Sequence, residues 1–516
     1  MENSKISYAV LLAFIVMIFA SEYSFADVKL PAIFSDNMVL QQKAEARFWG
    51  WASPGEKISI TPSWSKKTLF TEADDSGNWK VSVPTLAAGG PFDIKISGEN
   101  VIVLKDVLIG EVWVCSGQSN MVFFLHSADS AKEAIAAANY PNIRYFSVQR
   151  QYGTHPFKDA PGSVWQKTTP EDAGMFSAVA YYFAKKIHHD LKVPVGIVYS
   201  AWGGTPAEAW TPGSDFKHDD SLKHYVERWN YIQQHAREDS VTWYHKLDQW
   251  EKNDSGKTSV KKPEIPQTLY YFRRPWREPG VLFNGMINPV IPFTIKGVLW
   301  YQGESNVGYA NEYEYLFAKM IQSWRSDWKE KGGQKILPFY FVQISAFGYS
   351  NMNNAAIVRN AQYDVMKKID RTGMAVTIDL GNMKNIHYTH KKQVGDRLAL
   401  IAEAKSYGFK NIIYEGPTCE KINREGNKLQ LDFNQQIFTI DQKKPGGFEI
   451  GYRDPAFPDS VIYVKAKSLI SGNKVTAWED EVKNPIAVRY GWLLVGEANL
   501  QNKEGLPAFP FEKKIN

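Results

Sequence analysis

The feature that most constrains the fold is a repeated order of apolar strand-like runs and helical stretches between residues 107 and 405. The run LIGEVWVCSG precedes the amphipathic stretch SAVAYYFAKKIHHDL, and the runs VPVGIVYSAWGG and KGVLWYQGES follow it, with the helix-like stretch YEYLFAKMIQSWRSDW after them. Strands this apolar must be buried on both faces, which indicates a parallel sheet with helices on each side. The sequence therefore predicts an α/β core.

The segments on either side of this core have a different pattern. Residues 27–106 contain short alternating runs such as KISITPSW and WKVSVPTL, separated by the turn-forming clusters SPGE and DDSGN. This pattern predicts an N-terminal β-sandwich-like domain. Runs such as KLQLDFN and VIYVKAK predict a second β domain over residues 406–516. Within the core, the polar and Trp-rich stretch at about 213–289 is an insertion, which we expect to cover one end of the sheet as a lid or binding loop.

The first 26 residues have the pattern of a secretory signal peptide. Lys5 precedes an apolar stretch, and the small residues Ser24 and Ala26 have the spacing of a cleavage site. The apolar stretch is shorter than the roughly 20 residues that a spanning helix needs. We expect cleavage after Ala26 and a secreted or periplasmic protein without stable membrane insertion; the alternative is an uncleaved anchor.

Charge and cysteine content exclude several classes of protein. The net charge of +5 comes from scattered rather than clustered basic residues, so nucleic acid is not an expected partner. Cys115 and Cys419 are the two cysteines of the sequence, which excludes a disulfide framework and a multi-cysteine zinc site. The sequence does not tell whether they pair with each other. His188 and His189 lie beside lysines on an amphipathic helix, which is typical of a solvated face rather than a metal site.

Four polar segments follow the predicted strands, namely CSGQSNM, SAWGGTPAEAW, LWYQGESN and IDLGNMKNIHYTHKK. Ligands of parallel sheets bind beyond the carboxyl ends of the strands, so we expect these segments to meet at one site. Ser119 is a candidate nucleophile there, with a histidine as its base and glycine turns as oxyanion donors. It does not lie in a G-x-S-x-G elbow, because Met121 occupies the last position. The spacing alone leaves both a nucleophile and a simple turn open.

In their order along the chain, CSGQSNM, AWGGTPAEAW, LWYQGESN and DLGNMKNIHYTHKKQVGDRLA resemble the conserved blocks of sialate O-acetylesterase-type proteins of the SGNH-hydrolase superfamily. The stretches LPAIFSDNMVLQQ and NLQNKEGLPAFPF are also similar to that family, so the resemblance covers nearly the whole chain after residue 26. It implies a flavodoxin-like three-layer core. It also implies a serine carboxylic-ester hydrolase that removes O-acetyl groups from sialic acid through an acetyl-serine intermediate, with no metal or organic cofactor.

The resemblance also implies roles for individual residues. Ser119 would be the nucleophile, and His387 the base that takes its proton and later protonates the leaving sugar hydroxyl. The oxyanion hole would combine the backbone N–H groups of Ser119 and Gly204 with the side chain of Gln302, because an amide donates hydrogen bonds without ionising. His390 is the alternative base, although the match to the family block favours His387.

One part of the family pattern is missing. In much of the family the histidine sits in a DIHP-like motif, whereas this chain has the stretch NIHY at residues 385–388, and Lys384 stands three positions before the histidine, where related enzymes place an aspartate. Asp379 at the end of the preceding strand is a candidate for orienting His387. The alternative is a backbone carbonyl, which would leave a working Ser–His dyad.

Further residues of the four segments are candidates for substrate contact. The alternative for Glu304 and Asn306 is that they stabilise their own turn. Glu208 is expected to support the turn formed by the two glycines of AWGGTPAEAW, called the GG turn below. Arginines pair with carboxylates through two parallel hydrogen bonds, so those of the FRRPWR stretch are candidates for the sialate carboxylate, unless they are solvated. The substrate-contact candidates are Gln118, Asn120, Trp202, Glu304 and Asn306, with Trp300 as a further pocket residue, and the arginines are Arg273, Arg274 and Arg277.

The expected partner is an O-acetylated sugar or glycan. Two alternatives to the sialate reaction stay open. The same chemistry is possible on acetylated xylan or on another plant or microbial glycan, and the chain is alternatively a carbohydrate-binding protein with a decayed hydrolase core.

Overall fold

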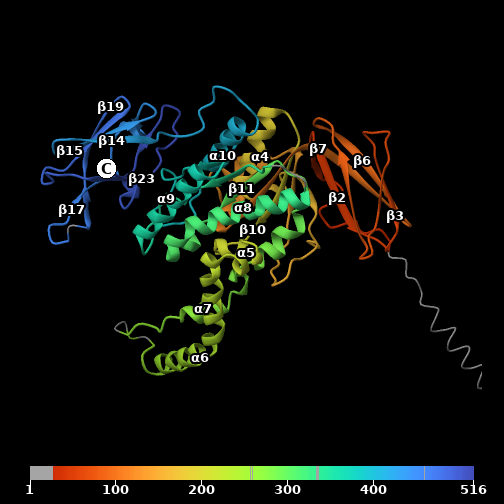
Figure 1. The fold of residues 1–516 in the computed structure, drawn as a ribbon, viewed down its shortest axis with the longest axis horizontal. Coiled ribbons are helices and arrows are strands. Elements are labelled where there is room, and N and C mark those ends of the chain that lie inside the picture. Colours follow the sequence, from red (N-terminus) through yellow and green to blue (C-terminus); the bar gives the residue numbers. More distant parts are fainter. Residues whose placement is uncertain (1–26, 256, 258–259, 333–335, 458, 516) are drawn as a thin grey trace, which may run out of the picture.

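A computed structural model describes residues 27–255, 257, 260–332, 336–457 and 459–515 (Figure 1). The predicted signal peptide lies outside these residues. Within the described ranges, no helix combines the length and the apolar character that crossing a membrane requires.

The centre of the molecule is a sheet in the order β13-β12-β11-β7-β10-β8-β9. Its strands pair in parallel, except that β9 is antiparallel to β8 at one edge. The predicted α/β core with a parallel sheet is therefore confirmed. The strands are β7 (Val101–Gly117), β8 (Tyr140–Ser147), β9 (Trp165–Thr168), β10 (Val195–Ala201), β11 (Gly297–Tyr301), β12 (Phe339–Val342) and β13 (Thr372–Ala375).

Helices cover both faces of this sheet, as the apolar strands require. Along β7, Trp113 and Cys115 belong to the apolar cluster on one face, whereas Val112 and Val114 belong to the cluster on the other. This alternation follows from the two-residue period of a strand. The first face packs against α4 (Ala178–Leu191) and α10 (Lys391–Lys405), and the second against α8 (Tyr313–Gly332) and α9 (Met352–Lys368). Two short helices, α2 (Ser119–Val122) and α3 (Ala131–Ala136), follow β7.

The N-terminal β region is continuous with the core through β7. The first half of this 17-residue strand pairs with β6 in the N-terminal region, and the second half lies in the centre of the parallel sheet. The expected boundary at residue 106 therefore falls inside one strand. The N-terminal strands are β1 (Val39–Gln41), β2 (Glu45–Trp51), β3 (Lys57–Pro62), β4 (Leu69–Glu72), β5 (Asn78–Pro84) and β6 (Gly89–Ser97).

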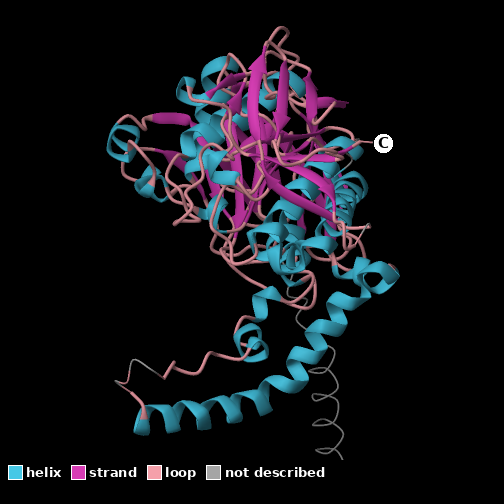
Figure 2. Cartoon of the chain, turned by 90° about the vertical axis from the view of Figure 1, so that its left-hand side faces the viewer, coloured by secondary structure: helices cyan, strands magenta, loops and turns pink. Residues whose placement is uncertain are grey.

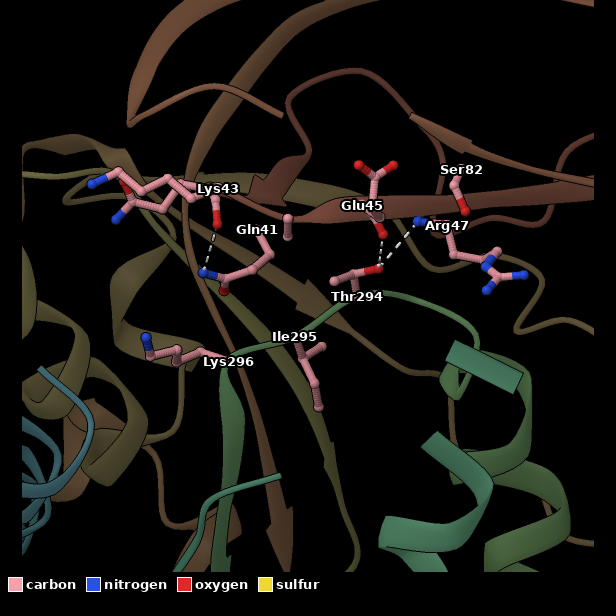
Figure 3. Close-up of a pocket in the computed structure, with 10 residues that line it drawn as sticks. Gln41, Lys43, Glu45, Arg47, Ser82, Thr294, Ile295 and Lys296 are labelled. Atoms are coloured by element: carbon pink, nitrogen blue, oxygen red, sulfur yellow. Dashed lines mark hydrogen bonds between the residues drawn. The ribbon is translucent and has the colours of Figure 1, made fainter. Parts of the chain in front are cut away.

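A polar cavity of about 530 Å³ lies where the N-terminal region meets the core (Figure 3). Thr294 closes this junction, because its hydroxyl accepts a hydrogen bond from the Arg47 N–H and donates one to the Glu45 carbonyl. Lys296 lines the cavity directly before β11 begins. The cavity is therefore at the amino end of the parallel strands, opposite to the edge where ligands of such sheets bind.

The insertion forms an arm instead of a cover over the sheet. It consists of α5 (Gly213–His218), α6 (Lys223–Asn253) and α7 (Gln267–Phe272), and α6 points away from the body of the molecule (Figures 1 and 2). The fully buried residues of α6 end at Ala236, and Trp243, Leu247 and Trp250 beyond it are only partly buried. The expectation of a lid was wrong for this distal half, because it points away from the sheet (Figures 1 and 2). The chain after α7 returns to the core.

The C-terminal β region packs against α9 at the far end of the molecule from the N-terminal strands (Figure 1). Arg359 of α9 donates hydrogen bonds to the carbonyls of Gly491 and Trp492, and the Trp492 indole donates to Asn353. Cys115 in the core and Cys419 in this region are both free and buried. The strands are β14 (Cys419–Glu425), β15 (Lys428–Phe433), β16 (Phe438–Thr439), β17 (Phe448–Arg453), β18 (Val461–Lys465), β19 (Lys467–Ser471), β20 (Lys474–Trp478), β21 (Ala487–Tyr490), β22 (Leu500–Gln501) and β23 (Phe511–Lys514).

Candidate active site

Strand β7 occupies the position where the chain order of the sheet reverses. Strands β10 and β8 lie on one side of it, and β11, β12 and β13 lie on the other. The carboxyl end of such a strand is the usual ligand site of an open parallel sheet. β7 ends at Gly117, where φ is +136° and a Cβ atom would lie 2.1 Å from the carbonyl oxygen of Tyr301. Ser119 is the first residue of α2, so its backbone N–H has no partner within the helix.

The GG turn after β10 lies against this serine. The N–H of Trp202 donates to the Gly117 carbonyl at 3.0 Å. A Cβ on Gly203 would be 3.4 Å from the Cβ of Ser119, so the absence of a side chain lets the turn approach the serine. Gly204 follows with a φ of +71° and is exposed. Sequence reasoning selected Gly204 and passed over Gly203, although the GG pair itself was the available signal.

The turn after β11 is attached to the serine segment by Gln118. The side-chain oxygen of this residue accepts hydrogen bonds from the backbone N–H groups of Gly303 at 3.3 Å and Ser305 at 3.2 Å. Its backbone N–H donates to the Tyr301 carbonyl at 2.9 Å. Gln118 is buried, so the structure gives it a supporting contact between two turns and no exposed surface for a substrate.

Gln302 and Asn306 belong to a buried network beneath the GG turn. The Gln302 amide donates to the Thr205 carbonyl at 3.2 Å and to Asn306 Oδ1 at 2.6 Å. Asn306 Nδ2 in turn donates to the Glu208 carboxylate at 2.8 Å. Both hydrogens of the Gln302 amide are thus in use, and its side chain is 0% exposed. Gln302 could donate to an oxyanion only after releasing one of these partners. Glu208 supports the turn as expected from the sequence.

Asn120 connects the serine segment to two of the other segments. Its Nδ2 donates to Glu304 Oε1 at 2.6 Å and to the backbone carbonyl of Ile386 at 3.2 Å. Its Oδ1 accepts a hydrogen bond of 2.6 Å from Lys391 Nζ. Asn120 directly follows Ser119, and Ile386 directly precedes His387. Their hydrogen bond therefore connects the serine segment to the histidine loop. Asn120 and Glu304 are buried and face each other, which makes them supports of the site.

Lys391 is a buried cation that sequence reasoning missed. It is 0% exposed, and its Nζ lies 3.7 Å from the ring centroid of Tyr388 and 4.9 Å from that of Phe123. Burial lowers the pKa of Lys391 to about 7, and the Glu304 carboxylate opposes this change. No signal in the sequence distinguished it, because a lysine in the first turn of a helix is usually solvated.

His387 lies in the loop between β13 and α10. Its backbone N–H donates to Asn385 Oδ1 at 2.9 Å. Within the part of the chain that the structure describes, its imidazole makes no hydrogen bond with a carboxylate. Partial burial lowers the pKa of His387, and the positive charge of Lys391 lowers it further. The imidazole is therefore neutral at neutral pH, which is the form that a general base requires.

The structure does not bring Asp379 to His387. Both carboxylate oxygens of Asp379 accept hydrogen bonds from Arg397, at 2.7 and 2.6 Å. His390, the alternative base, is paired through Nδ1 with Asp129. A histidine with a carboxylate partner therefore exists three residues from His387, but both side chains of that pair are about half exposed, at 50% and 48%.

An aromatic platform borders the GG turn. The rings of Trp202 and Trp276 stack with centroids 5.4 Å apart and an angle of 12° between their planes, and both are partly exposed. Trp300, in contrast, is fully buried in the core. Trp276 and Arg277 belong to the segment that returns from the arm, and Arg277 donates to the Gly204 carbonyl. Trp202 is thus the predicted substrate-contact residue that is partly exposed at the surface beside the serine.

The other two arginines of this segment are held within the arm. Arg273 contacts the Tyr244 hydroxyl at 2.5 Å, and the Arg274 guanidinium lies 3.6 Å from the ring centroid of Tyr270. The structure therefore gives them no place beside Ser119.

No cluster of three or more metal-ligating side chains occurs among the described residues. His188 Nδ1 lies 2.6 Å from the Val193 carbonyl, and His189 Nδ1 lies 2.6 Å from Asp190. The site instead combines a serine at the start of a helix, two turns that contain glycine, and a loop that carries a neutral histidine. Such a set can carry out acyl transfer.

Comparisons with known proteins agree with this chemistry. Residues 109–257 and 272–403 match the family described as "Carbohydrate esterase, sialic acid-specific acetylesterase". The sialate O-acetylesterase of Homo sapiens is 30% identical over 504 residues, which cover 90% of this chain and 87% of that protein. The sialate O-acetylesterase of Rattus norvegicus is 30% identical over 81% of each chain.

A solved structure extends the similarity to the fold. The crystal structure of a carbohydrate acetylesterase from Xanthomonas citri superimposes with a TM-score of 0.77 and 32% identity, covering 94% of this chain and 99% of that chain. The match includes the core and both flanking β regions. The chain is therefore a carboxylic-ester hydrolase and belongs to the sialic acid-specific acetylesterase family of carbohydrate esterases.

Proposed function

We propose that this protein removes O-acetyl groups from sialic acid through an acetyl-serine intermediate. The single observation that carries the proposal is the connection made by Asn120. This buried residue directly follows Ser119. Its side chain donates hydrogen bonds to the Ile386 carbonyl of the histidine loop and to the Glu304 carboxylate of the turn after β11, the QGES turn of residues 302–305. Family membership and the named relatives support the sialate substrate.

In the proposed reaction, the Ser119 hydroxyl attacks the acetyl carbonyl while His387 takes its proton. The tetrahedral oxyanion accepts hydrogen bonds from the backbone N–H groups of Ser119 and Gly204. The intermediate collapses with cleavage of the bond to the sugar oxygen, which receives the proton from His387. Water then attacks the acetyl-serine with His387 as base, and acetate leaves as Ser119 regains its proton.

We assign this chemistry to a Ser–His dyad. Because Asp379 pairs with Arg397, the support of His387 comes from its loop, which Asn120 holds through the Ile386 carbonyl. A carboxylate that orients the histidine improves catalysis but is not needed for the attack itself. Gln302 then holds the GG turn in place through Thr205.

The proposal extends to location and domain organisation. The signal-like sequence of residues 1–26 supports a secreted or periplasmic enzyme. The proposed catalytic domain covers residues 107–405, between β domains at 27–106 and 406–516. An extracellular location suits an enzyme whose substrate is a glycan.

A second substrate class is favoured by one observation. The structural relative from Xanthomonas citri, which covers nearly all of this chain, is a carbohydrate acetylesterase, a class that is broader than sialate esterases. The same serine chemistry on another acetylated glycan, such as acetylated xylan, is therefore the second candidate function.

Acetate release decides between the two functions. Purified protein without residues 1–26 is incubated with O-acetylated sialic acid and with acetylated xylo-oligosaccharide, beside the Ser119→Ala variant. We expect release from sialic acid by the wild type and none above background by the variant. Release from xylo-oligosaccharide alone would assign the enzyme to the second function, and equal rates for wild type and variant would contradict serine catalysis.

A further inference from the structure

Arg150 lies at the same edge of the sheet as Ser119. It follows β8, whose carboxyl end points to this edge because β8 is parallel to β10. The guanidinium of Arg150 is exposed and lies 5.6 Å from the ring centroid of Trp202. Trp202 in turn stacks on Trp276 and directly precedes the GG turn. A charged group and an aromatic platform therefore stand together next to the reacting serine.

Arg150 has no acidic partner among the described residues. The neighbouring polar group is the buried Tyr199 hydroxyl. Burial raises the pKa of Tyr199, and the positive charge of Arg150 and its hydrogen bond with the hydroxyl oppose that rise. Arg277, a second guanidinium at this edge, is already bonded to the Gly204 carbonyl. A guanidinium has five N–H donors, so Arg150 retains donors that a bound anion can use beside Tyr199.

The space beside the turn indicates where a sugar would lie. A cavity of about 40 Å³ lined by Pro206, Arg277 and Ser305 adjoins the GG turn. On the open side of the turn, Trp202 and Trp276 are partly exposed, and this is the surface on which a sugar can rest.

We propose that Arg150, Trp202 and Trp276 form a subsite for an acidic sugar, in which Arg150 pairs with the carboxylate and the two indole rings pack against apolar faces of the substrate. This inference rests on the proposed function and deepens it, because it names the residues that select an anionic sugar over a neutral one. Guanidinium pairs with carboxylate through two parallel hydrogen bonds, and aromatic rings supply apolar contact area.

The test compares O-acetylated sialic acid with its carboxyl methyl ester, in which a methyl group removes the negative charge at the proposed contact. The kcat/KM for acetate release is measured for wild type, Arg150→Gln, Arg150→Lys and the control Arg273→Gln, whose arginine lies in the arm. We expect the wild type and the control to prefer the free acid by about 10-fold or more, the range of a charge-assisted hydrogen bond. Arg150→Gln should lose this preference, and Arg150→Lys should restore part of it.

The outcomes separate this inference from the proposed function. If the wild type releases acetate from sialic acid and Arg150→Gln keeps the wild-type ratio between acid and ester, the subsite is overturned while the proposed function stands. If the wild type cleaves neither sialic acid substrate but does cleave acetylated xylo-oligosaccharide, the sialate function is overturned, and the acidic-sugar subsite with it. Thermal melting of all variants verifies that each is folded.

Discussion

At the scale of single residues, the site depends on polar side chains that face each other instead of the substrate. Gln118, Asn120, Glu304 and Asn306 are all buried and joined by hydrogen bonds to neighbouring turns. Buried polar groups are costly unless they are paired, so such a network fixes one arrangement of the turns. The proposed catalysis by Ser119 and His387 therefore depends on buried residues that hold the turns in place.

Substitution of Lys391 tests whether the buried hydrogen-bond network affects catalysis. In Lys391→Met, Asn120 loses a hydrogen bond from a charged donor, and we expect kcat to fall about 5- to 30-fold, corresponding to about 1–2 kcal/mol. The cation lowers the pKa of His387, so its removal should raise that pKa and shift the acidic limb of kcat/KM to higher pH. Lys391 is charged on that limb because its own pKa is about 7.

The control for this prediction is the adjacent Lys392→Met. Lys392 is exposed and pairs with Asp396, away from Asn120. Its variant should keep the wild-type kcat and the wild-type pH profile. A loss of kcat in Lys391→Met without any movement of the acidic limb would show that the lysine acts through structure alone.

The two histidines of the loop give a second prediction at this scale. His387→Ala should lower kcat on p-nitrophenyl acetate by at least about 10³-fold, since the general base is lost. His390→Ala should stay within about 3-fold of wild type, because His390 contributes an exposed pair with Asp129. The opposite order would make His390 the base and Asp129 its orienting carboxylate.

At the scale of elements, the carboxyl ends of β7, β10 and β11 place the serine, the GG turn and the QGES turn at one edge of the sheet. Gly117 permits this arrangement because it has no side chain and approaches Tyr301 closely.

The distal half of the arm is attached to the rest of the chain in a different way. Distal α6 is attached to the return segment through contacts within the arm, such as the Trp243 indole with the Pro263 carbonyl. The distal half of α6 therefore has few ties to the body, whereas the proximal half is held by buried residues and by the ion pair of Arg228 with Glu312.

This arrangement predicts that the distal arm can be removed. Asp239 and Thr268 are hydrogen-bonded across the base of the arm, so their chain segments are adjacent. Replacing residues 241–265 with a short Gly-Ser linker should leave the melting temperature and the rate on p-nitrophenyl acetate close to those of the wild type. A large fall in either would mean that the distal arm supports the site. The matched control, Trp229→Ala in the buried proximal half of α6, should destabilise the protein.

At the scale of the whole molecule, the C-terminal β region supports the part of the chain that carries His387. A Cβ on Gly491 would lie 2.6 Å from Ile378 Cδ1, and a Cβ on Gly496 would lie 3.4 Å from Met383 Cγ. Ile378 and Met383 lie between β13 and the histidine. The C-terminal region therefore packs against the segment that leads from β13 to His387.

Gly491→Val tests this contact. Gly491 has a φ of +60°, so a valine there carries backbone strain of about 1–3 kcal/mol in addition to the clash with Ile378. Gly472→Val is the control, because Gly472 has a φ of +64° and nothing within 4 Å of its Cβ position. We expect Gly491→Val to have the lower melting temperature and the lower kcat. Equal effects in the two variants would show that the contact with Ile378 does not matter.

The sequence by itself determined the α/β core and the order of the four strand-end segments. Apolar periodicity and glycine turns are local properties, and they are readable because each strand or turn depends mainly on its own residues. The same local pattern made Ser119 a candidate and placed Trp202 beside the GG turn, whereas the role of His387 came from the resemblance of its segment to the family. It also gave the β character of the regions before residue 107 and after residue 405.

The tertiary structure alone decided which polar side chains support the site and which remain open to a ligand. Asn120 meets Glu304 and Lys391 across 184 and 271 positions of sequence. Asp379 pairs with Arg397 instead of His387, and Arg150 stands beside Trp202 with no acidic partner in the described chain. The physical reason is that the partner of a buried polar group depends on the long-range packing around it, which no local pattern encodes.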